Sequence, residues 1–460
     1  MSLDPTTQTI AAIATPKGIG ALSIIRISGL KTLPAVKRIF KSNKEIDAFP
    51  RTLITGNILD PITHEVIDHS LVVFFPGPNS YTGEDTAEIH THGGVFVTNQ
   101  VFQAIISCGL RPAYPGEFTL RAFSNGKMDL TQAEAVLDVI HSKNRQFLKT
   151  AMKSLSGATG KRIKNIREQI ISLLARIEVV IEYPDENIPD MPKQEMQQHI
   201  ETILQELYNL INSYKSDKQL NKAMAIALVG RPNVGKSSLM NRLLGQDRSI
   251  IHDAPGTTRD LIGDWITISG QEVLVMDTAG ITISREPVEQ EGVRRTKDFT
   301  TNDADEIILI LDASEPLNED DVQIINYLKD TKKNHITALN KSDLENRIDK
   351  NRIIKAAGDF IEISALTGQG INTLLTALEQ RIDQNKEFLS EVTITNQRHH
   401  EMLIKAQHAL EEAVLNLKSV PVDILAIDLR DAATALGLIT GENITENILD
   451  QIFSNFCVGK

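Results

Sequence analysis

The sequence has little of several features that would each indicate a particular class of protein. Only two cysteines, Cys108 and Cys457, occur among 460 residues, which excludes a disulfide framework and favours a reducing compartment. No apolar run approaches the roughly 18 residues that a membrane-spanning helix needs. The first residues, Met-Ser-Leu-Asp-Pro-Thr, also lack the basic and apolar regions of a signal peptide. We therefore expect a cytoplasmic protein with no membrane partner.

Positive charge is also in deficit, because 48 Lys and Arg stand against 60 Asp and Glu, for a net charge of −12. This balance argues against binding a polyanion over the whole surface, so such a partner must meet a local patch. One basic segment, residues 143–167, contains no acidic residue; its cations are Lys143, Arg145, Lys149, Lys153, Lys161, Arg162, Lys164 and Arg167. The segment could face RNA phosphates, or it could be the solvated face of a helix.

The length and an ordinary globular composition predict about three domains. Short β-branched runs at 22–27, 70–75 and 86–91 predict an α+β domain over residues 1–120. Apolar residues at helical spacing from about Ala133 to Tyr214 predict the first part of an all-α domain, residues 121–217. Helical patterning returns over 385–460, so we expect a second part of that domain there. Two separate helical domains are the alternative.

Between these helical segments, strands alternate with helices over residues 218–384, which predicts a mostly parallel sheet. The apolar strand cores lie at 224–229, 274–276, 307–311, 336–339 and 360–363. The fold class expected is therefore multidomain, with an α/β domain inserted into a helical one.

A phosphate-binding motif opens this α/β segment. Residues Gly230–Ser238 read Gly-Arg-Pro-Asn-Val-Gly-Lys-Ser-Ser, which matches G-x-x-x-x-G-K-[ST] between a buried strand and a helix. In this pattern glycines let backbone N–H groups surround phosphates, while Lys236 meets the β- and γ-phosphates and Ser237 binds magnesium. The segment is therefore predicted to be a P-loop.

Two further motifs follow in the order that a guanine-nucleotide switch requires. In the motif Asp277–Gly280, Asp277 ends a strand and can hold magnesium through water. Gly280 lets the backbone approach the γ-phosphate. Asn340–Asp343 reads Asn-Lys-Ser-Asp, whose carboxylate can accept hydrogen bonds from the guanine edge, and Ser364–Leu366 is expected beneath the base. The sequence therefore predicts a protein that binds and hydrolyses GTP.

The loop between the first two motifs, Asp253–Asp260, is predicted to be a switch loop with a second magnesium ligand, Thr258, or alternatively Thr257. The residue after Gly280 is Ile281, whose side chain cannot orient water. Catalysis therefore needs another group, and the following segment offers Arg285 as a cation and Glu286, Glu289 and Glu291 as bases.

The nucleotide-contacting residues expected from these motifs form four groups along the chain. They are Asn233, Val234, Gly235, Lys236, Ser237 and Ser238; His252, Asp253, Ala254, Pro255, Gly256, Thr257 and Thr258; Asp277, Thr278, Ala279 and Gly280; and Asn340, Lys341, Asp343, Ser364, Ala365 and Leu366.

The whole chain resembles the tRNA-modification GTPase MnmE family, also called TrmE, within the TrmE-Era-EngA-YihA-Septin-like GTPases. The resemblance is carried by Gly230–Ser238, Gly256–Asp260 and Asp277–Gly280, and by Phe75–Asp85, Arg111–Phe118 and the terminal Phe456-Cys-Val-Gly-Lys460. The GTPase motifs alone would also fit Era-like or EngA-like ribosome-assembly GTPases. The N-terminal and C-terminal motifs do not.

The resemblance implies a homodimer with a folate-binding N-terminal domain. It also implies a FAD-dependent MnmG-type partner, with which the family adds an aminomethyl or carboxymethylaminomethyl group at C5 of the wobble uridine of certain tRNAs. A tetrahydrofolate derivative, either 5-formyl or 5,10-methylene, supplies the carbon. Hydrolysis is expected to be stimulated by potassium and activated when two GTPase domains meet.

The resemblance also assigns roles to residues. The potassium ligands implied are Asn233, His252, Ala254 and Thr257, and the folate contacts implied are Arg26, Glu88, Lys127 and Lys460. Glu289 matches the water-orienting glutamate, so the catalytic set is Glu289, Lys236 and Cys457. Cys457 could be a nucleophile or thiol relay in the modification, or alternatively a small buried hydrophobe.

Two other functions stay open at this point. The first is a GTP-dependent, RNA-binding ribosome-assembly factor that performs no covalent chemistry. The second is a folate-dependent transferase that needs no flavoprotein and is only regulated by GTP, although the chain's lack of a dinucleotide-binding fingerprint disfavours it.

Overall fold

The computed structural model describes residues 8–182, 191–216, 220–221, 224–246, 263–268, 271–277, 304–331, 333, 335–384, 392–417 and 422–460. The chain divides into two compact units. One comprises residues 1–141, 150–216 and 390–460, and the other comprises residues 142–149 and 217–389. The second unit thus interrupts the first in sequence, which confirms that an α/β domain is inserted into the chain. The boundaries at residues 120, 217 and 384 stay predictions.

The N-terminal part of the first unit is built on a seven-stranded sheet with the order β3-β4-β5-β6-β2-β1-β7. Its elements are β1 (Ile10–Ile13), β2 (Leu22–Ser28), α1 (Thr32–Ile39), β3 (Phe40–Lys41), β4 (Ile54–Leu59), β5 (Val66–Phe75), β6 (Thr86–His92), α2 (Val95–Ile106) and β7 (Arg111–Pro112). One face of the sheet carries apolar residues such as Ile25, Val72 and Ile89, which share a core with α1 and α2. The predicted α+β fold is confirmed, and the opposite face is left for polar side chains.

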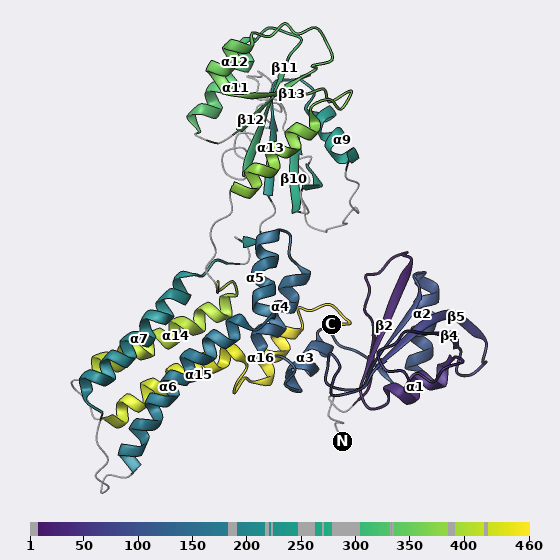
Figure 1. The fold of residues 1–460 in the computed structure, drawn as a ribbon, viewed down its shortest axis with the longest axis vertical. Coiled ribbons are helices and arrows are strands. Elements are labelled where there is room, and N and C mark those ends of the chain that lie inside the picture. Colours follow the sequence, from purple (N-terminus) through teal and green to yellow (C-terminus); the bar gives the residue numbers. More distant parts are fainter. Residues whose placement is uncertain are drawn as a thin grey trace. The chain divides into compact units, whose positions relative to one another are not determined.

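The rest of the first unit is helical. It contains α3 (Glu117–Ser124), α4 (Leu130–Ile140), α6 (Ala158–Glu182), α7 (Lys193–Asn212), α14 (Gln397–Asn416), α15 (Val422–Thr440) and α16 (Glu446–Phe453). The helix α5 (Arg145–Leu155) is divided between the units, because its residues up to 149 belong to the second. Figure 1 shows α6, α7, α14 and α15 side by side, and their apolar faces form one core that includes Ile170, Leu207, Leu403 and Leu429. The helices before and after the inserted domain therefore form one bundle, and the alternative of two separate helical domains is wrong. None of the helices in the described ranges is long and apolar enough to cross a membrane.

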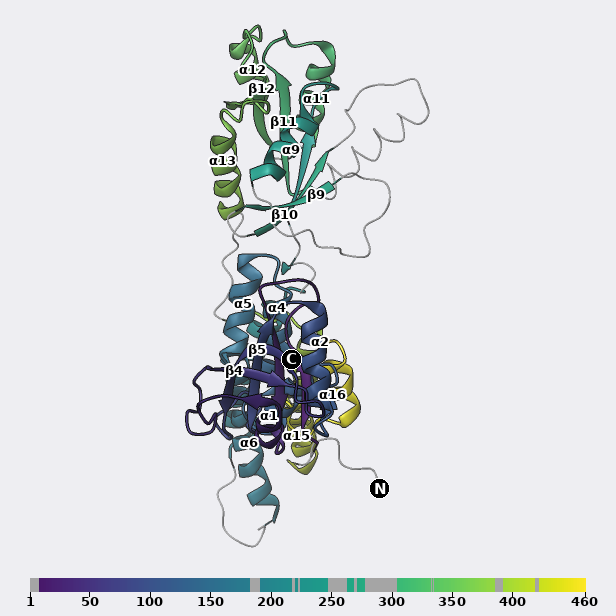
Figure 2. The same cartoon turned by 90° about the vertical axis from the view of Figure 1, so that its right-hand side faces the viewer.

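The inserted α/β unit has a six-stranded sheet with the order β13-β12-β11-β8-β10-β9, in which only β9 runs antiparallel to its neighbour. Its elements are β8 (Met224–Val229), α9 (Lys236–Gln246), β9 (Gly263–Ile268), β10 (Gln271–Asp277), β11 (Glu306–Asp312), α11 (Glu319–Asp330), β12 (His335–Asn340), α12 (Lys350–Ala357), β13 (Phe360–Glu362) and α13 (Ile371–Gln384). The central strands β8 and β11 are apolar and buried along nearly their whole length, because helices cover both faces. Figure 2 shows α13 on one side of the sheet and α11 on the other, as the two apolar clusters require.

A buried ionic cluster joins the two halves of the helical bundle. Glu134 on α4 accepts hydrogen bonds from Arg398 Nε (2.9 Å) and Nη2 (2.7 Å), and its Oε2 lies 2.6 Å from His399 Nε2. Arg398 also donates to the carbonyls of Leu438 and Ile439 at the end of α15. Burial alone would raise the pKa of Glu134, but the charges and hydrogen bonds of His399 and Arg398 lower it from its ordinary value of 4.5 to about 2. The carboxylate therefore stays ionised although it is buried.

The variant Glu134→Gln is expected to destabilise the helical bundle by about 3 kcal/mol at pH 7, because it leaves a buried guanidinium without its counter-charge. The pKa of Glu134 is lower in the folded state, so its stabilisation is complete above about pH 4.5 and is lost as the pH falls toward 2. Urea unfolding between pH 7 and pH 3 measures both effects. The exposed Glu412→Gln on α14 is the matched control, and equal stabilities for the two variants at pH 7 would refute the role of the cluster.

Candidate functional site

The predicted nucleotide motifs meet at the carboxyl edge of the parallel sheet in the inserted unit. Asp277, the last residue of β10, pairs with Leu228 near the end of β8, and Asp312 at the end of β11 pairs with Asn340 at the end of β12. Loops at this edge of an open α/β sheet are where ligands bind. The P-loop leaves β8 here, so strand order alone brings together segments more than 100 residues apart.

The P-loop has the geometry that phosphate binding requires. Lys236 is buried, and its Nζ donates to the carbonyls of Gly230 (2.8 Å) and Arg231 (2.9 Å), so the ammonium lies inside the loop. Asn233 has φ +63° and Gly235 has φ +97°, left-handed conformations that Asn tolerates and Gly adopts freely. Lys236 is also the first residue of α9, where a helix N-terminus favours anions. Ser237, the next residue, is exposed, as a metal-binding hydroxyl must be.

Asn340 ties the P-loop to the segment expected beneath the base. Its Nδ2 donates to the carbonyl of Val234 (2.8 Å), and its Oδ1 accepts from the backbone N–H of Ala365 (2.9 Å). A Cβ at Gly235 would lie 2.2 Å from Asn340 Nδ2, so only glycine allows this approach. The predicted motifs at 230–238, 340–343 and 364–366 are therefore parts of one site.

The remaining residues of the base region differ in exposure. Lys341 has φ +66° and forms an ion pair with the buried Asp312. Burial alone would raise the pKa of Asp312, but hydrogen bonds from Lys341 and Ser314 hold it below its ordinary value. Asp343 is exposed, so its carboxylate is accessible to a ligand that arrives from solvent.

Several predicted site residues lie outside the described residues, so the structure says nothing of their positions. They are His252, Asp253, Ala254, Pro255, Gly256, Thr257, Thr258, Thr278, Ala279, Gly280 and Glu289, and for Asp277 only the backbone is described.

A second candidate site lies on the polar face of the N-terminal sheet. Arg26 on β2 and Glu88 on β6 are direct register partners, and Arg26 Nε donates to Glu88 Oε1 at 3.0 Å. Both side chains are about four-fifths buried, which strengthens the pair relative to a surface ion pair. His90 also lies on β6, and its Nε2 is 3.5 Å from Glu88 Oε2. This nitrogen is buried and has no hydrogen-bond partner within the described part of the chain. The site therefore offers a cation, a carboxylate and an unsatisfied imidazole nitrogen.

The C-terminal tail completes this site. Val458 forms an isolated antiparallel bridge with Pro115, and the backbone N–H of Phe118 donates to the carbonyl of Lys460 (3.1 Å). The carbonyl of Gly459 accepts from Arg26 Nη1 at 3.3 Å. Gly459 has φ +98°, and a Cβ there would lie 2.9 Å from Ala14 Cα, so this close approach requires glycine. Three of the four predicted folate contacts, Arg26, Glu88 and Lys460, thus come together.

Burial lowers the pKa of Lys460, and the positive charge of Arg26 lowers it further, while Glu88 and Cys457 oppose the shift. Cys457 is exposed, so its interpretation as a small buried hydrophobe is wrong. A chemical role for its thiol stays a prediction.

Lys127, the fourth predicted contact, lies against the loop between β5 and β6. Its Nζ donates to the carbonyl of Pro78 (3.0 Å), and the same loop carries Tyr81. The Tyr81 ring centroid is 5.6 Å from the Arg26 guanidinium, and that of Phe118 is 5.9 Å from it. Sequence reasoning missed these two aromatic rings as site residues, although both stand inside the motifs at 75–85 and 111–118.

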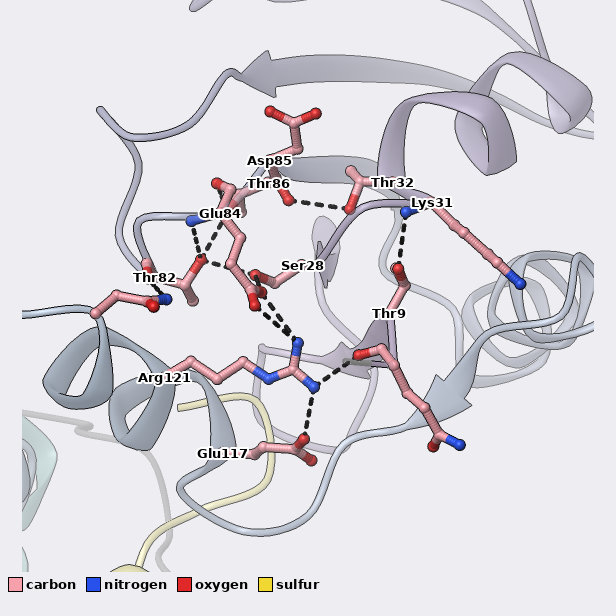
Figure 3. A network of polar contacts seen from close by, with 12 residues as sticks. Thr9, Ser28, Lys31, Thr32, Thr82, Glu84, Asp85, Thr86, Glu117 and Arg121 are labelled. Atoms are coloured by element: carbon pink, nitrogen blue, oxygen red, sulfur yellow. Dashed lines mark hydrogen bonds and ion pairs between the residues drawn. The ribbon is translucent and has the colours of Figure 1, made fainter. Parts of the chain in front are cut away.

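A polar network fixes that loop to α3 (Figure 3). Arg121 donates to both carboxylate oxygens of Glu84 (3.2 and 3.0 Å) and to Glu117 Oε1 (2.9 Å). Ser28 donates to Glu84 Oε2 at 2.7 Å, which connects the network to β2. Burial alone would raise the pKa of Glu117, but hydrogen bonds from Arg111, Tyr114 and Arg121 hold it below its ordinary value. The loop that carries Tyr81 is thereby tied to α3 by the ion pair between Glu84 and the buried Arg121.

Comparison with known proteins identifies the family. A model described as the MnmE helical domain matches residues 130–457, and one described as the GTP-binding protein TrmE N-terminus matches residues 9–127. The tRNA modification GTPase MnmE of Clostridioides difficile strain 630 is 41% identical over 98% of this chain and 99% of its own length. The chain belongs to the MnmE family of tRNA modification GTPases.

Other similar proteins were also found. The MnmE protein of Natranaerobius thermophilus is 40% identical over 99% of this chain and 100% of its own length. Among solved structures, the Era protein of Aquifex aeolicus matches 41% of this chain and 67% of its own, with 28% identity and a TM-score of 0.30.

In this MnmE-family chain, the structure also bears on whether the basic segment 143–167 faces RNA or is a solvated helix face. Cations of this segment form ion pairs with acidic side chains, among them Arg162 with Glu206, Lys164 with Asp129, and Arg167 with Glu442. For these three residues a role in the charge balance of the helices is favoured over contact with RNA phosphates.

The variant Gly235→Ala is expected to weaken binding of GDP and GTP by about tenfold or more, because the methyl group is strained at this φ and displaces Asn340. Calorimetric titration with each nucleotide measures the loss. The same change at Gly94, where a Cβ would meet nothing within 4 Å, is the control. Unchanged affinity in Gly235→Ala would contradict the role assigned to this glycine.

Proposed function

We propose that this chain hydrolyses GTP and, with a FAD-dependent MnmG-type protein, adds an aminomethyl or carboxymethylaminomethyl group to C5 of the wobble uridine of certain tRNAs. The observation that carries the GTPase half is the joining of the P-loop to the base-recognition segment through Asn340. Family membership supports the tRNA half. We further propose that the protein acts in the cytoplasm as a homodimer.

The nucleotide site has groups suited to each part of GTP. Lys236 and the backbone N–H groups at the start of α9 would hold the phosphates, and Asp343 would accept hydrogen bonds from the guanine edge. Magnesium would be held by the hydroxyl of the exposed Ser237 and by Thr258, and when bound it neutralises charge on the β- and γ-phosphates. Asp277 would orient the water around the metal.

Hydrolysis requires a group that orients the attacking water, which the aliphatic side chain of Ile281 cannot do. We assign the orientation of the attacking water to Glu289. Potassium, when bound, adds positive charge against the phosphates, and the oxygen donors would be the side chain of Asn233 and groups at His252, Ala254 and Thr257. The left-handed φ of Asn233 and its exposure support this, because they leave its side chain accessible.

Hydrolysis of GTP is expected to be faster in potassium than in sodium, and to rise with protein concentration if two GTPase domains must meet. Glu289→Ala should lower the potassium-stimulated rate by about a hundredfold or more while leaving GTP affinity nearly unchanged, because the side chain acts on water. Steady-state rates in both salts, with titrations of GTP, measure these effects. Glu319→Ala, at an exposed position at the start of α11, is the matched control. Equal rates in the two salts would remove potassium from the mechanism, and a large loss of GTP affinity in Glu289→Ala would mean that its role is misassigned.

The N-terminal site fits a tetrahydrofolate derivative. The Glu88 carboxylate, held by Arg26, can accept hydrogen bonds from the donor edge of the pterin. Lys127 can pair with a carboxylate of the glutamate tail, and the partly exposed Tyr81 offers ring surface. The unsatisfied His90 Nε2 is a buried polar atom that a ligand could satisfy. The folate, when bound, supplies the carbon for the modification.

The tail residue Cys457 would act beside this site. Its thiol is exposed, and Lys460 lies close enough to interact with it electrostatically. We propose that the thiol serves as a nucleophile or relay toward the substrate uridine, with the MnmG-type partner providing the redox cofactor.

Glu88→Gln is expected to weaken binding of 5-formyltetrahydrofolate by about tenfold, since an amide is a poorer acceptor and leaves Arg26 without its counter-charge. Equilibrium dialysis on the full-length protein measures the affinity, and thermal unfolding checks that the variant is folded. Glu65→Gln, at an exposed position before β5, is the control. A ribosome-assembly factor would bind no folate. Absence of binding in the wild-type protein and in both variants would therefore favour that alternative function.

A further inference from the structure

The base-recognition segment of the nucleotide site is held from a second side, by an arginine that no motif includes. Arg242 lies on α9, six residues after Lys236 begins that helix. Its Nε donates to the carbonyl of Ala365 at 3.0 Å, and its Nη2 donates to the carbonyl of Leu366. The backbone N–H of Ala365 is already bonded to Asn340 Oδ1 (2.9 Å). The backbone of Ala365 is thus fixed at its N–H and at its carbonyl by two different side chains.

These bonds close a ring. Asn340 also bonds to Val234 in the P-loop, and the P-loop continues directly into α9, which carries Arg242. The path therefore runs from Val234 through Asn340 and Ala365 to Arg242 and returns along the helix. Because the links between the separate segments are directional hydrogen bonds, the base-recognition segment cannot shift without breaking a bond to Asn340 or to Arg242.

Ala365 is buried in the core of the α/β unit, but the turn that follows it is held mainly by local bonds. Ser364 N–H donates to the carbonyl of Gln369, and Gly368 N–H donates to the carbonyl of Ser364, so these bonds shape the turn but do not attach it to α9. The side chain of Leu366 is 76% exposed and provides little packing. A guanidinium suits the task because its planar fork can reach two successive carbonyls at once, which an ammonium on a flexible chain does less well.

The contact also borders an open space. A cavity of about 410 Å³ is lined by Ser238, Asn241, Arg242, Ala365 and Leu366, among others. Ser238 follows the phosphate-binding residues directly, so the cavity joins the phosphate end of the site to the segment beneath the base.

We propose that Arg242 is a positioning residue for guanine recognition, which sets the segment 364–366 at the height and angle that the base requires. This inference rests on the proposed binding of guanine nucleotides. It predicts that Arg242 affects recognition of the base and leaves the phosphate chemistry at Lys236 intact.

The test compares GDP with inosine diphosphate, which lacks the exocyclic amine, on the full-length protein. Arg242→Ala is expected to weaken GDP binding by about tenfold, in line with the loss of two hydrogen bonds from a charged group, and to weaken inosine diphosphate less, so that the preference for guanine falls. In GTP hydrolysis the KM should rise with little change in kcat. Arg242→Lys should restore part of the affinity. Arg352→Ala, an exposed arginine on α12, is the matched control.

Each outcome has a separate meaning. A wild-type protein that binds the two diphosphates equally would refute the guanine site of the proposed function, and the role of Arg242 with it. A wild-type preference for GDP that persists undiminished in Arg242→Ala would overturn only the positioning role. A lowered melting temperature with parallel losses for both nucleotides would also overturn it, because the arginine would then support the fold and not the base.

Discussion

The amide side chain of Asn340 is the contact on which the nucleotide site of this chain depends. It uses its donor on the P-loop and its acceptor on the segment after β13, so that two loops from different strands share one rigid frame. The frame exists because β8, β11 and β12 are neighbours in the parallel sheet and end at one edge. Glycine at position 235 is a consequence of the same contact, since any side chain there would occupy the space of the amide.

The N-terminal site follows a different building principle. Its charged pair, Arg26 and Glu88, is set by the register of two antiparallel strands, whereas its third side is the chain's last few residues, which bridge to Pro115. On an uncovered sheet face such an ion pair would be exposed to water. Here the tail, the aromatic rings and the loop fixed by Arg121 bury the pair and make its charges effective.

Much of the fold could be predicted from the sequence, because the relevant signals are local. Buried apolar runs, helical spacing and the P-loop spacing each extend over a few residues, and they predicted the α+β domain, the helical bundle and the inserted α/β domain. The contacts made by Arg242, Tyr81 and Phe118 could not be predicted in this way. Arg242 reaches a segment more than 120 residues away, and nothing near it in the sequence differs from an ordinary helix surface. The exposure of Cys457 likewise depends on how the tail crosses the N-terminal domain.

The bundle core shared by α6, α7, α14 and α15 has a consequence for the order in which the protein folds during synthesis. The first two helices leave the ribosome with one apolar face uncovered, and their partners on α14 and α15 are separated from them by the whole α/β domain. The α/β domain is nearly contiguous in sequence and can bury its core as soon as β13 and α13 emerge. Folding of the helical bundle, and with it the closing of the Glu134 cluster, must wait until roughly the last seventh of the chain is made. The newborn protein therefore has a folded GTPase domain before its helical bundle can close.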